Sequence, residues 1–451
     1  MKLAQKARNI LLACFLLSPC AARAADAGGK APQAAPAVRK VTVTFYGNTA
    51  SAKGFTWYTS AASTASDLQI AEKTGAAPDF SRAARFAGKY SHAANSPELV
   101  HKAEASGLKP GTAYYFRAGD SGLNAWSETG TFQTAAAAGP FTFMDLADPQ
   151  AKSEDECILS AATIAKAYGA VPDAKFLAIN GDIVDAGNKE KQWDWLLGHS
   201  EANLLNTTVL PVAGNHEEQK NAFISHFDIA AASGSSTNTG AYYSVDYGNA
   251  HFIVLNTNEK SSEYADLTPR QVEWLKSDAA ARPAGAWLIV LLHKGPYSTS
   301  GHATDADIAG PNGMRAKAAP LLARLGADLV LQGHDHIYAR TKHIKEDGTA
   351  GDAGPVYLIP ATAGPKTYYR NPMLPPGYEA LFAVDGENHA AAYGPDLKDP
   401  RRPMRGQIQN FTAITIDGPT LTAVSYEIDQ SSNSARPYII DRFALSKDGG
   451  K

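Results

Sequence analysis

The pattern of apolar and polar residues changes character about a third of the way along the chain. Residues 41 to about 134 contain short alternating runs such as VTVTFY and FTWYTS, with no long helical pattern between them. Such runs are typical of antiparallel strands. From residue 140 on, strand-like apolar runs alternate with helical patterns at 154–168, 269–281 and 314–325. This alternation predicts an α/β domain.

These two patterns predict two domains. At 451 residues the chain is longer than a single core usually supports. We expect a flexible lead-in at 25–37, an all-β sandwich at 38–135 and an α/β domain at 140–445, with AAAAG at 135–139 as a linker. Two irregular segments, 297–313 and 369–409, are long enough to shape a substrate mouth.

Five apolar runs in the second domain are each followed by a side chain that can bind a metal. The runs cover 141–144, 176–179, 208–212, 287–292 and 329–331, and the side chains after them are Asp148, Asp182, Asn215, His293, His334 and His336. Groups at strand ends converge in one crevice in open α/β sheets. Asp, Asn and His together suit zinc, iron or manganese rather than calcium, which prefers oxygen ligands throughout. The sequence therefore predicts a site for two metal ions.

Two details of this set have alternatives. Asp145 also follows the first apolar run, but we favour Asp148 because the turn-forming Pro149 comes directly after it. His334 and His336 are two residues apart, so in a continuing strand they would share a face. In a turn they could instead reach neighbouring metals from one short backbone segment.

The first 24 residues have the order of a secretory signal: basic residues, an apolar stretch, then Ala22-Arg23-Ala24. We expect cleavage near Ala24 and export to the periplasm or the medium. No other stretch reaches the roughly 18 apolar residues that a membrane span needs. Cleavage removes four basic residues and no acidic one, so the formal net charge falls from −3 to −7. This charge disfavours a nucleic-acid-binding surface.

The cysteines predict no disulfide in the mature chain. Cys14 and Cys20 lie in the expected signal, which leaves Cys157 alone. Cys20 could be a lipid attachment site, but the proline before it fits that pattern poorly. Cys157 follows a capping box that begins at Ser153, and it shares a helical face with apolar residues. We therefore expect a buried structural thiol.

The segment GLKPGTAYYFRAG resembles part of a fibronectin type III domain, in particular the N-terminal domain of purple acid phosphatases. In it, Pro110-Gly111 fits the centre of a type II turn. The five metal-binding segments ADPQ, GDIVD, GNHE, VLLH and GHDH resemble the signature of the calcineurin-like metallophosphoesterase superfamily. The resemblance implies an α/β/β/α sandwich for residues 140–445. It also implies that Tyr114 is a tyrosine corner, with its hydroxyl bonded to nearby backbone.

The resemblance further implies a role for each site residue. Asp182 would bridge both metal ions, Asp148 and His336 would complete the first, and Asn215, His293 and His334 would complete the second. His216 would face the substrate, where it could stabilise the phosphoryl charge or protonate the leaving group. His302 is a further candidate for substrate contact, although it could equally be an exposed loop histidine.

Two positions depart from the family pattern. Asp185 stands where purple acid phosphatases have the tyrosine whose phenolate binds ferric iron, so we expect a colourless protein. Asp185 could bind the first metal or only hydrogen-bond near the site. Gln150 stands where many superfamily members have a histidine, so Gln150 is a further possible ligand, and the first metal could bind less tightly there or be a different ion.

These features predict an exported phosphatase that hydrolyses small phosphomonoesters by in-line attack of a metal-bound hydroxide. A phosphodiesterase or nucleotidase is the alternative within the same superfamily. A binding or adhesive protein, in which the β domain is the working part, is the alternative outside enzymes. The sequence does not predict the oligomeric state.

Overall fold

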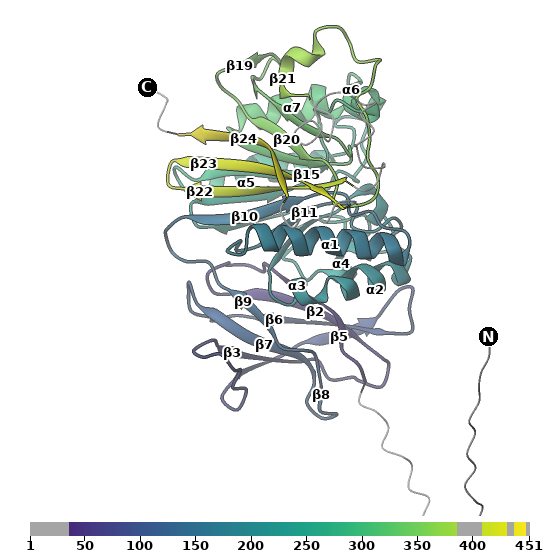
Figure 1. The fold of residues 1–451 in the computed structure, drawn as a ribbon, viewed down its shortest axis with the longest axis vertical. Helices are drawn as coiled ribbons and strands as arrows, with labels where there is room; N and C mark the ends of the chain where they lie inside the picture. Colours follow the sequence, from purple (N-terminus) through teal and green to yellow (C-terminus); the bar gives the residue numbers. More distant parts are fainter. Residues whose placement is uncertain (1–35, 386–407, 431–436, 448–451) are drawn as a thin grey trace, which may run out of the picture. The chain divides into compact units, whose positions relative to one another are not determined.

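The computed structural model describes residues 36–385, 408–430 and 437–447 (Figure 1). From Pro36 on, the chain forms one compact unit. The expected signal with Cys14 and Cys20, and residues 386–407 of the second predicted mouth segment, lie outside the described residues.

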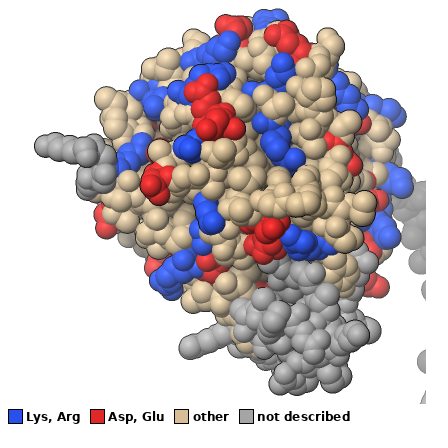
Figure 2. All heavy atoms as spheres, turned by 90° about the horizontal axis from the view of Figure 1, so that it is seen from above, with Lys and Arg blue, Asp and Glu red and all other residues tan. Residues whose placement is uncertain are grey.

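The surface carries charges of both signs. On the face seen in Figure 2, basic and acidic side chains are interspersed over the described part of the molecule. No helix in that part of the chain is long and apolar enough to cross a membrane.

The N-terminal module is built of strands alone over residues 36–140. Its strands are β1 Arg39–Thr44, β2 Lys53–Thr59, β3 Asp67–Glu72, β4 Ala84–Ala87, β5 Lys89–His92, β6 Leu99–Ala105, β7 Ala113–Asp120, β8 Ala125–Trp126 and β9 Gly130–Gln133. They form two sheets, with β1, β2, β6 and β5 in one and β4, β3, β7, β8 and β9 in the other. Phe55 and Trp57 from the first sheet pack against Phe116 and Phe132 from the second. The predicted β-sandwich is therefore confirmed.

The turn before β7 has the predicted geometry. Gly111 has a φ of +63°, which the third position of a type II turn requires. The backbone N–H of Lys109 donates to the hydroxyl of Tyr114 at 2.8 Å. Tyr114 therefore acts as the expected tyrosine corner.

The second domain has two sheets between two layers of helices. The first sheet continues through β10 Phe141–Leu146, β11 Leu177–Asn180, β12 Val209–Val212, β22 Ile408–Asp417, β23 Thr420–Asp429 and β24 Tyr438–Ser446. The second contains β13 Tyr243–Tyr247, β14 Ala250–Val254, β15 Trp287–Lys294, β16 Leu329–Gly333, β17 Tyr338–Thr341, β20 Val356–Pro360 and β21 Phe382–Val384. A small hairpin pairs β18 His343–Ile344 with β19 Ala350–Gly351.

The helices cover the outer faces of these sheets. They are α1 Glu154–Ala170, α2 Glu190–His199, α3 Glu201–Leu204, α4 Ala222–His226, α5 Pro269–Ala281, α6 Ala306–Ala309 and α7 Met314–Arg324, with the 3₁₀ helices η1 Asn215–Glu217, η2 Gly301–Thr304 and η3 Tyr378–Leu381. Side chains of α1 and α2 pack on the first sheet. Those of α5 and α7 pack on the second. The predicted α/β/β/α sandwich is confirmed.

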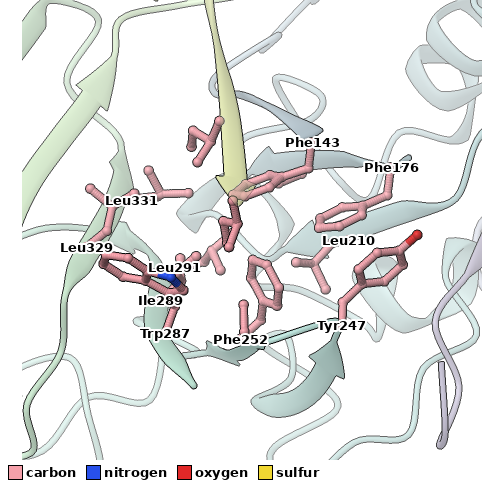
Figure 3. Packing of buried hydrophobic residues seen from close by; sticks show 14 of the residues in the cluster. Phe143, Phe176, Leu210, Tyr247, Phe252, Trp287, Ile289, Leu291, Leu329 and Leu331 are labelled. Carbon is pink, nitrogen blue, oxygen red and sulfur yellow. The ribbon is translucent and has the colours of Figure 1, made fainter. Parts of the chain in front are cut away.

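An aromatic core lies between the two sheets (Figure 3). The rings of Phe143 and Phe176 stack at 4.9 Å, and Phe252 from the facing sheet meets both edge-on at 5.3 and 5.5 Å. Aromatic pairs of this kind contribute roughly 0.5–1.5 kcal/mol each beyond the area they bury. This packing holds the two sheets, and hence the ends of their strands, at a fixed separation.

The first helix of this domain behaves as predicted. The side chain of Ser153 accepts a hydrogen bond from the backbone N–H of Glu156 at the start of α1. Cys157 is fully buried beneath it, and burial raises the pKa of its thiol to about 12. Cys157 is therefore a buried, unreactive thiol, as expected.

The two modules share one sheet. Strand β1 pairs in parallel with β12, with Thr44 opposite Val209, so ten strands run from β24 to β5 without a break. A buried ion cluster lies beside this junction. Lys40 Nζ lies 2.7 Å from Glu98, 2.5 Å from Glu190 and 2.9 Å from Asp194. Because Glu190 and Asp194 belong to α2, this cluster joins β1 to the second domain.

We expect the buried His251 to make the stability of the protein depend on pH. His251 bonds Asp246 at 2.7 Å and Asp278 at 3.0 Å. Burial alone would lower the pKa of His251, but these two aspartates outweigh it and raise the pKa to about 9. The pKa of His251 is higher in the folded protein than in the unfolded chain, so the protonated imidazole stabilises the fold. This contribution is fully present below pH 6.5 and is lost as the pH rises through about 9. We expect wild type to lose roughly 1–2 kcal/mol between these pH values.

The control is His251→Gln, which keeps hydrogen-bonding capacity but cannot carry the charge. Urea unfolding at pH 6 and pH 9 measures the difference. A variant that loses as much stability as wild type over this interval would contradict the role of His251.

Candidate metal centre

The five predicted segments meet where strands of the two sheets end. Asp148 and Asp182 follow β10 and β11, and Asn215 follows β12, all in the first sheet. His293 lies inside β15, and His334 follows β16, both in the second sheet. Within each sheet these strands are parallel neighbours, so their carboxyl ends lie at the same edge. The site therefore lies at the edge where the carboxyl ends of these strands meet.

Three of these residues have unusual backbone conformations. Asp148, Asp182 and His334 have φ values of +53°, +47° and +70°. Non-glycine residues rarely adopt this left-handed region, and those that do cluster at functional sites. Each of them lies within two residues of the end of a strand, where the chain changes direction.

Glycines allow these turns to approach one another. A Cβ at Gly214 would lie 2.1 Å from the backbone nitrogen of Asp182, and one at Gly333 would lie 2.4 Å from the carbonyl oxygen of Asn180. Any larger residue at these positions would push the turns apart. The glycines of GNHE and GHDH are therefore required by close packing at the site.

One group of donor atoms surrounds Asp182. Ligand atoms of Asp182, His293 and His334 all lie within 4.8 Å of one another. His293 Nε2 is 3.1 Å from Asp182 Oδ2 and 3.2 Å from Asn215 Oδ1. The other nitrogen of His293 bonds the carbonyl oxygen of Asn180 at 2.8 Å, which fixes the ring. The four predicted residues Asp182, Asn215, His293 and His334 thus lie together.

A second group surrounds Asp148. His336 Nε2 lies 3.4 Å from Asp148 Oδ1, and the backbone N–H of His334 donates to both carboxylate oxygens at 3.1 Å. His334 and His336 lie in the turn after β16, so of the two arrangements considered the turn is the one observed. It lets His334 join the group at Asp182 while His336 joins the group at Asp148.

Asp145 is separate from both groups. It lies inside β10, where Ala178 and Thr412 are its sheet partners. Its carboxylate is fully buried and has no hydrogen-bond partner among the described residues. Burial, and then repulsion by Asp148, raise the pKa of Asp145 well above its ordinary value. Asp148 is therefore the carboxylate that meets the histidines.

His216 and Gln150 contact each other beside Asp182. His216 Nδ1 donates to the backbone oxygen of Asp185, so Nε2 accepts from the amide of Gln150 at 2.5 Å. His216 Nε2 also lies 3.8 Å from Asp182 Oδ2, and the imidazole is 28% exposed. Gln150 is buried against His216, so its amide faces the histidine expected to meet substrate.

The remaining two candidates lie at the rim. The ring of His302 lies 4.2 Å from that of His334, and its Nδ1 bonds Asp305 at 2.7 Å. The carboxylate of Asp185 faces Lys366, with 3.4 Å between Oδ1 and Nζ. Both residues are thus close to the centre, but each already has a charged or polar partner.

Sequence reasoning missed Glu217, the last residue of GNHE. Its buried carboxylate accepts backbone hydrogen bonds from Ile183 at 2.9 Å, Val184 at 3.2 Å and Gly214 at 2.9 Å. These bonds tie the turn that carries Asp182 to the turn that carries Asn215. In the sequence, only its place in the GNHE motif could have indicated this role of Glu217.

Sequence reasoning also missed the loop at 361–368, which follows β20. The hydroxyl of Thr362 donates to the backbone oxygen of Asp148 at 2.8 Å. His336 Nδ1 bonds the carbonyl oxygen of Lys366 at 3.0 Å, and the ring of Tyr368 stacks on His336 at 4.4 Å. This loop orients the Asp148 group, and it ends just before the segment predicted to form the mouth.

The aspartates and histidines of the centre shift one another's pKa values. Burial alone would raise the pKa of Asp182, but His293, and then His216 and His334, hold it below its ordinary value. Burial alone would lower the pKa of His293, but Asp182 and Asp148 raise it to about 9. For His334, burial, and then repulsion by His293 and His302, lower the pKa well below its ordinary value. The centre thus concentrates carboxylates and imidazoles that a cation would hold together.

The donor set fits borderline transition metals. Two buried carboxylates, one amide oxygen and three imidazoles converge, and oxygen and nitrogen donors in this mixture suit zinc, iron or manganese. His293 and His336 each bond a backbone carbonyl through Nδ1, which leaves Nε2 directed at the carboxylates. This is the usual orientation of a histidine that binds a metal.

Comparison with known families supports both modules. Residues 38–134 match the family described as purple acid phosphatase, N-terminal domain. Residues 146–338 match the family described as calcineurin-like phosphoesterase. The second match contains all six residues predicted to bind metal.

Individual proteins agree with these matches. Over 299 residues the chain is 26% identical to purple acid phosphatase 15 of Arabidopsis thaliana. This alignment covers 59% of the chain and 54% of that protein. Over 298 residues it is 28% identical to purple acid phosphatase 23 of the same plant, covering 59% of this chain and 62% of that protein. The chain thus aligns with less than two thirds of the length of either relative.

Solved structures share the fold. A purple acid phosphatase from yellow lupin (Lupinus luteus) seeds superposes with a TM-score of 0.68 at 15% identity, covering 91% of this chain and 74% of that one. The structure of PhoD superposes with a TM-score of 0.63 at 12% identity, covering 92% of each chain. The chain therefore combines a purple acid phosphatase N-terminal domain with a calcineurin-like phosphoesterase domain, and its homologues are purple acid phosphatases.

Proposed function

We propose that this protein is an exported phosphatase that uses two metal ions to hydrolyse small phosphomonoesters. The observation that carries the proposal is the meeting of two donor groups at one edge of the paired sheets, with Asp182 between His293 and His216. Asp148, His336 and Asp182 would hold one ion. Asp182, Asn215, His293 and His334 would hold the other.

When bound, two such ions would hold the phosphate group and lower the pKa of a water molecule for in-line attack on phosphorus. His216 is the residue suited to act on the phosphate or the leaving group. Asp185 holds its Nδ1, so Nε2 is the nitrogen directed toward Asp182 and the open side of the centre. There it would stabilise developing negative charge or deliver a proton.

Gln150 suits both protonation states of His216. Its amide N–H₂ bonds an unprotonated Nε2, whereas its Oε1, which has no partner among the described residues, could accept from a protonated Nε2 after rotation of the amide. Gln150 would therefore keep the imidazole in place through a proton transfer, and we propose this role for it instead of metal binding.

The metal pair would be iron, zinc or manganese. Asp185 provides no phenolate, so a ferric ion at this centre would lack the ligand that colours purple acid phosphatases. Export rests on the sequence of residues 1–24, and amino-terminal sequencing of the exported protein should give Ala25 as its first residue.

The test is reconstitution of metal-free protein. After chelation, we expect addition of zinc, manganese or iron to restore hydrolysis of 4-nitrophenyl phosphate, with about two ions bound per chain by elemental analysis. We expect bis(4-nitrophenyl) phosphate to react at least about tenfold more slowly in kcat/KM, because a monoester dianion matches the cationic centre better.

The reverse preference would indicate a phosphodiesterase of the same superfamily. Failure to bind any of the three metals, together with absence of hydrolysis of both esters, would overturn the proposal and favour a binding protein.

A further inference from the structure

An ion pair crosses the rim of the centre. Lys366 Nζ lies 3.4 Å from Asp185 Oδ1, and the two side chains are 36% and 26% exposed. This separation exceeds the roughly 2.7–2.9 Å of a tight charge-assisted hydrogen bond. An ammonium group has three N–H donors, and within the described part of the chain Asp185 is the only ion-pair partner of this one. Lys366 therefore keeps donors available for a ligand.

The backbone carbonyl groups of Asp185 and Lys366 bind the imidazoles of two histidines of the centre. Asp185 accepts from His216 through its carbonyl oxygen, and Lys366 accepts from His336 in the same way at 3.0 Å. The Lys366–Asp185 ion pair therefore connects the residue that holds His216, proposed to face substrate, with the residue that holds His336, proposed to hold metal. Because His216 is proposed to act on the leaving group, the alcohol part of a bound phosphoester would lie beside it, and Asp185 joins His216 to the ion pair.

Lys294 provides a contrast. It follows His293 directly, but its ammonium faces Asp266 at 3.4 Å and Asp307 at 3.1 Å. Its side chain is only 10% exposed, so both its charge and its donors are used within the protein. Among the described residues Lys366 has one carboxylate partner instead of two, and its side chain is 36% exposed.

We propose that Lys366 binds a second anionic group on the alcohol part of the substrate. The preferred substrates are then phosphomonoesters that carry a carboxylate or another phosphate close to the ester. Asp185 holds the ammonium in place without substrate and gives it up to the incoming anion. This inference rests on the proposed phosphatase function.

The test uses two substrates that differ in one group. Glycerol 2-phosphate and 2-phosphoglycerate share the same ester, but one CH₂OH group of the first is a carboxylate in the second. We expect wild type to have the higher kcat/KM for 2-phosphoglycerate. Lys366→Met should lower the ratio of the two kcat/KM values about tenfold, which corresponds to roughly 1.4 kcal/mol. The change should come from a higher KM for 2-phosphoglycerate.

Two further variants make the test independent of Lys366→Met. Lys366→Arg keeps the positive charge and should retain most of the preference. Asp185→Asn removes the competing carboxylate, so it should raise the ratio while both metal ions remain bound. Elemental analysis and thermal unfolding of each variant separate these effects from loss of metal or of fold.

The possible outcomes distinguish the two proposals. Equal loss on both substrates in Lys366→Met, or an unchanged ratio in Lys366→Met and Asp185→Asn, would overturn the role of Lys366. Loss of metal in Asp185→Asn would also overturn it, because Asp185 would then be a ligand. Absence of hydrolysis of both substrates by metal-loaded wild type would overturn the proposed function instead.

Discussion

Asp182→Asn is expected to reduce phosphomonoester turnover on the order of a thousandfold or more and to deplete both metal ions. Asp182 is almost fully buried, and its Oδ2 lies 3.1 Å from His293 Nε2 and 3.8 Å from His216 Nε2. In the proposed centre it is the carboxylate that both ions share. An amide offers one neutral oxygen in place of two charged ones. The measurements are kcat for 4-nitrophenyl phosphate and metal content per chain.

The matched control is His216→Ala. His216 is the neighbour of Asp182 that we propose acts on substrate, so this variant should keep its metal and lose roughly 10²–10⁴-fold in kcat. Near-normal turnover in Asp182→Asn would rule out its bridging position. Loss of metal in His216→Ala would make that residue a ligand.

Lys40→Met is expected to destabilise the protein by roughly 3–5 kcal/mol, because it removes the cation that Glu98, Glu190 and Asp194 share in a buried cluster. Burial alone would lower the pKa of Lys40, but Glu190, and then Glu98 and Asp194, raise it. Natural proteins are usually stable by only about 5–15 kcal/mol, so this loss would be a large share of the total. Urea unfolding at pH 7 would measure it.

Arg39→Met is the control for this change. Arg39 also pairs with Glu98, but its side chain is 51% exposed, so we expect a loss of at most about 1 kcal/mol. A comparably small loss in Lys40→Met would mean that the cluster relaxes or takes up protons without its lysine.

The fold was predictable where elements are long and periodic. The three helices expected from the pattern correspond to α1, α5 and α7, with ends within two residues. Helix α2 was missed because it is short and the residue that precedes it, Lys189, makes no side-chain capping bond. Short elements such as η2 and α6, which lie in the predicted irregular segment 297–313, depend on tertiary contacts rather than on local preference.

The centre was predictable where the ligand comes directly after a strand. The residues that hold these ligands in place were not predictable, because they act through backbone groups or lie far away in the sequence. Lys366 meets Asp185 across 181 positions, and Thr362 meets Asp148 across 214. Neither contact leaves a periodic signal in the chain. The pairing of β1 with β12 is hidden for the same reason, since no local pattern specifies which strand lies beside which.

That pairing has a consequence for how the chain can be divided. The first family match ends at residue 134 and the second begins at residue 146. Thr44 and Val209, one from each match, are nevertheless paired in one continuous sheet. A fragment trimmed at the family boundary would leave β12 with an open edge, and open edges invite pairing with other chains. The amino-terminal module is therefore a structural part of the sheet that carries Asp148, Asp182 and Asn215, and removing it would expose the edge of that sheet to solvent.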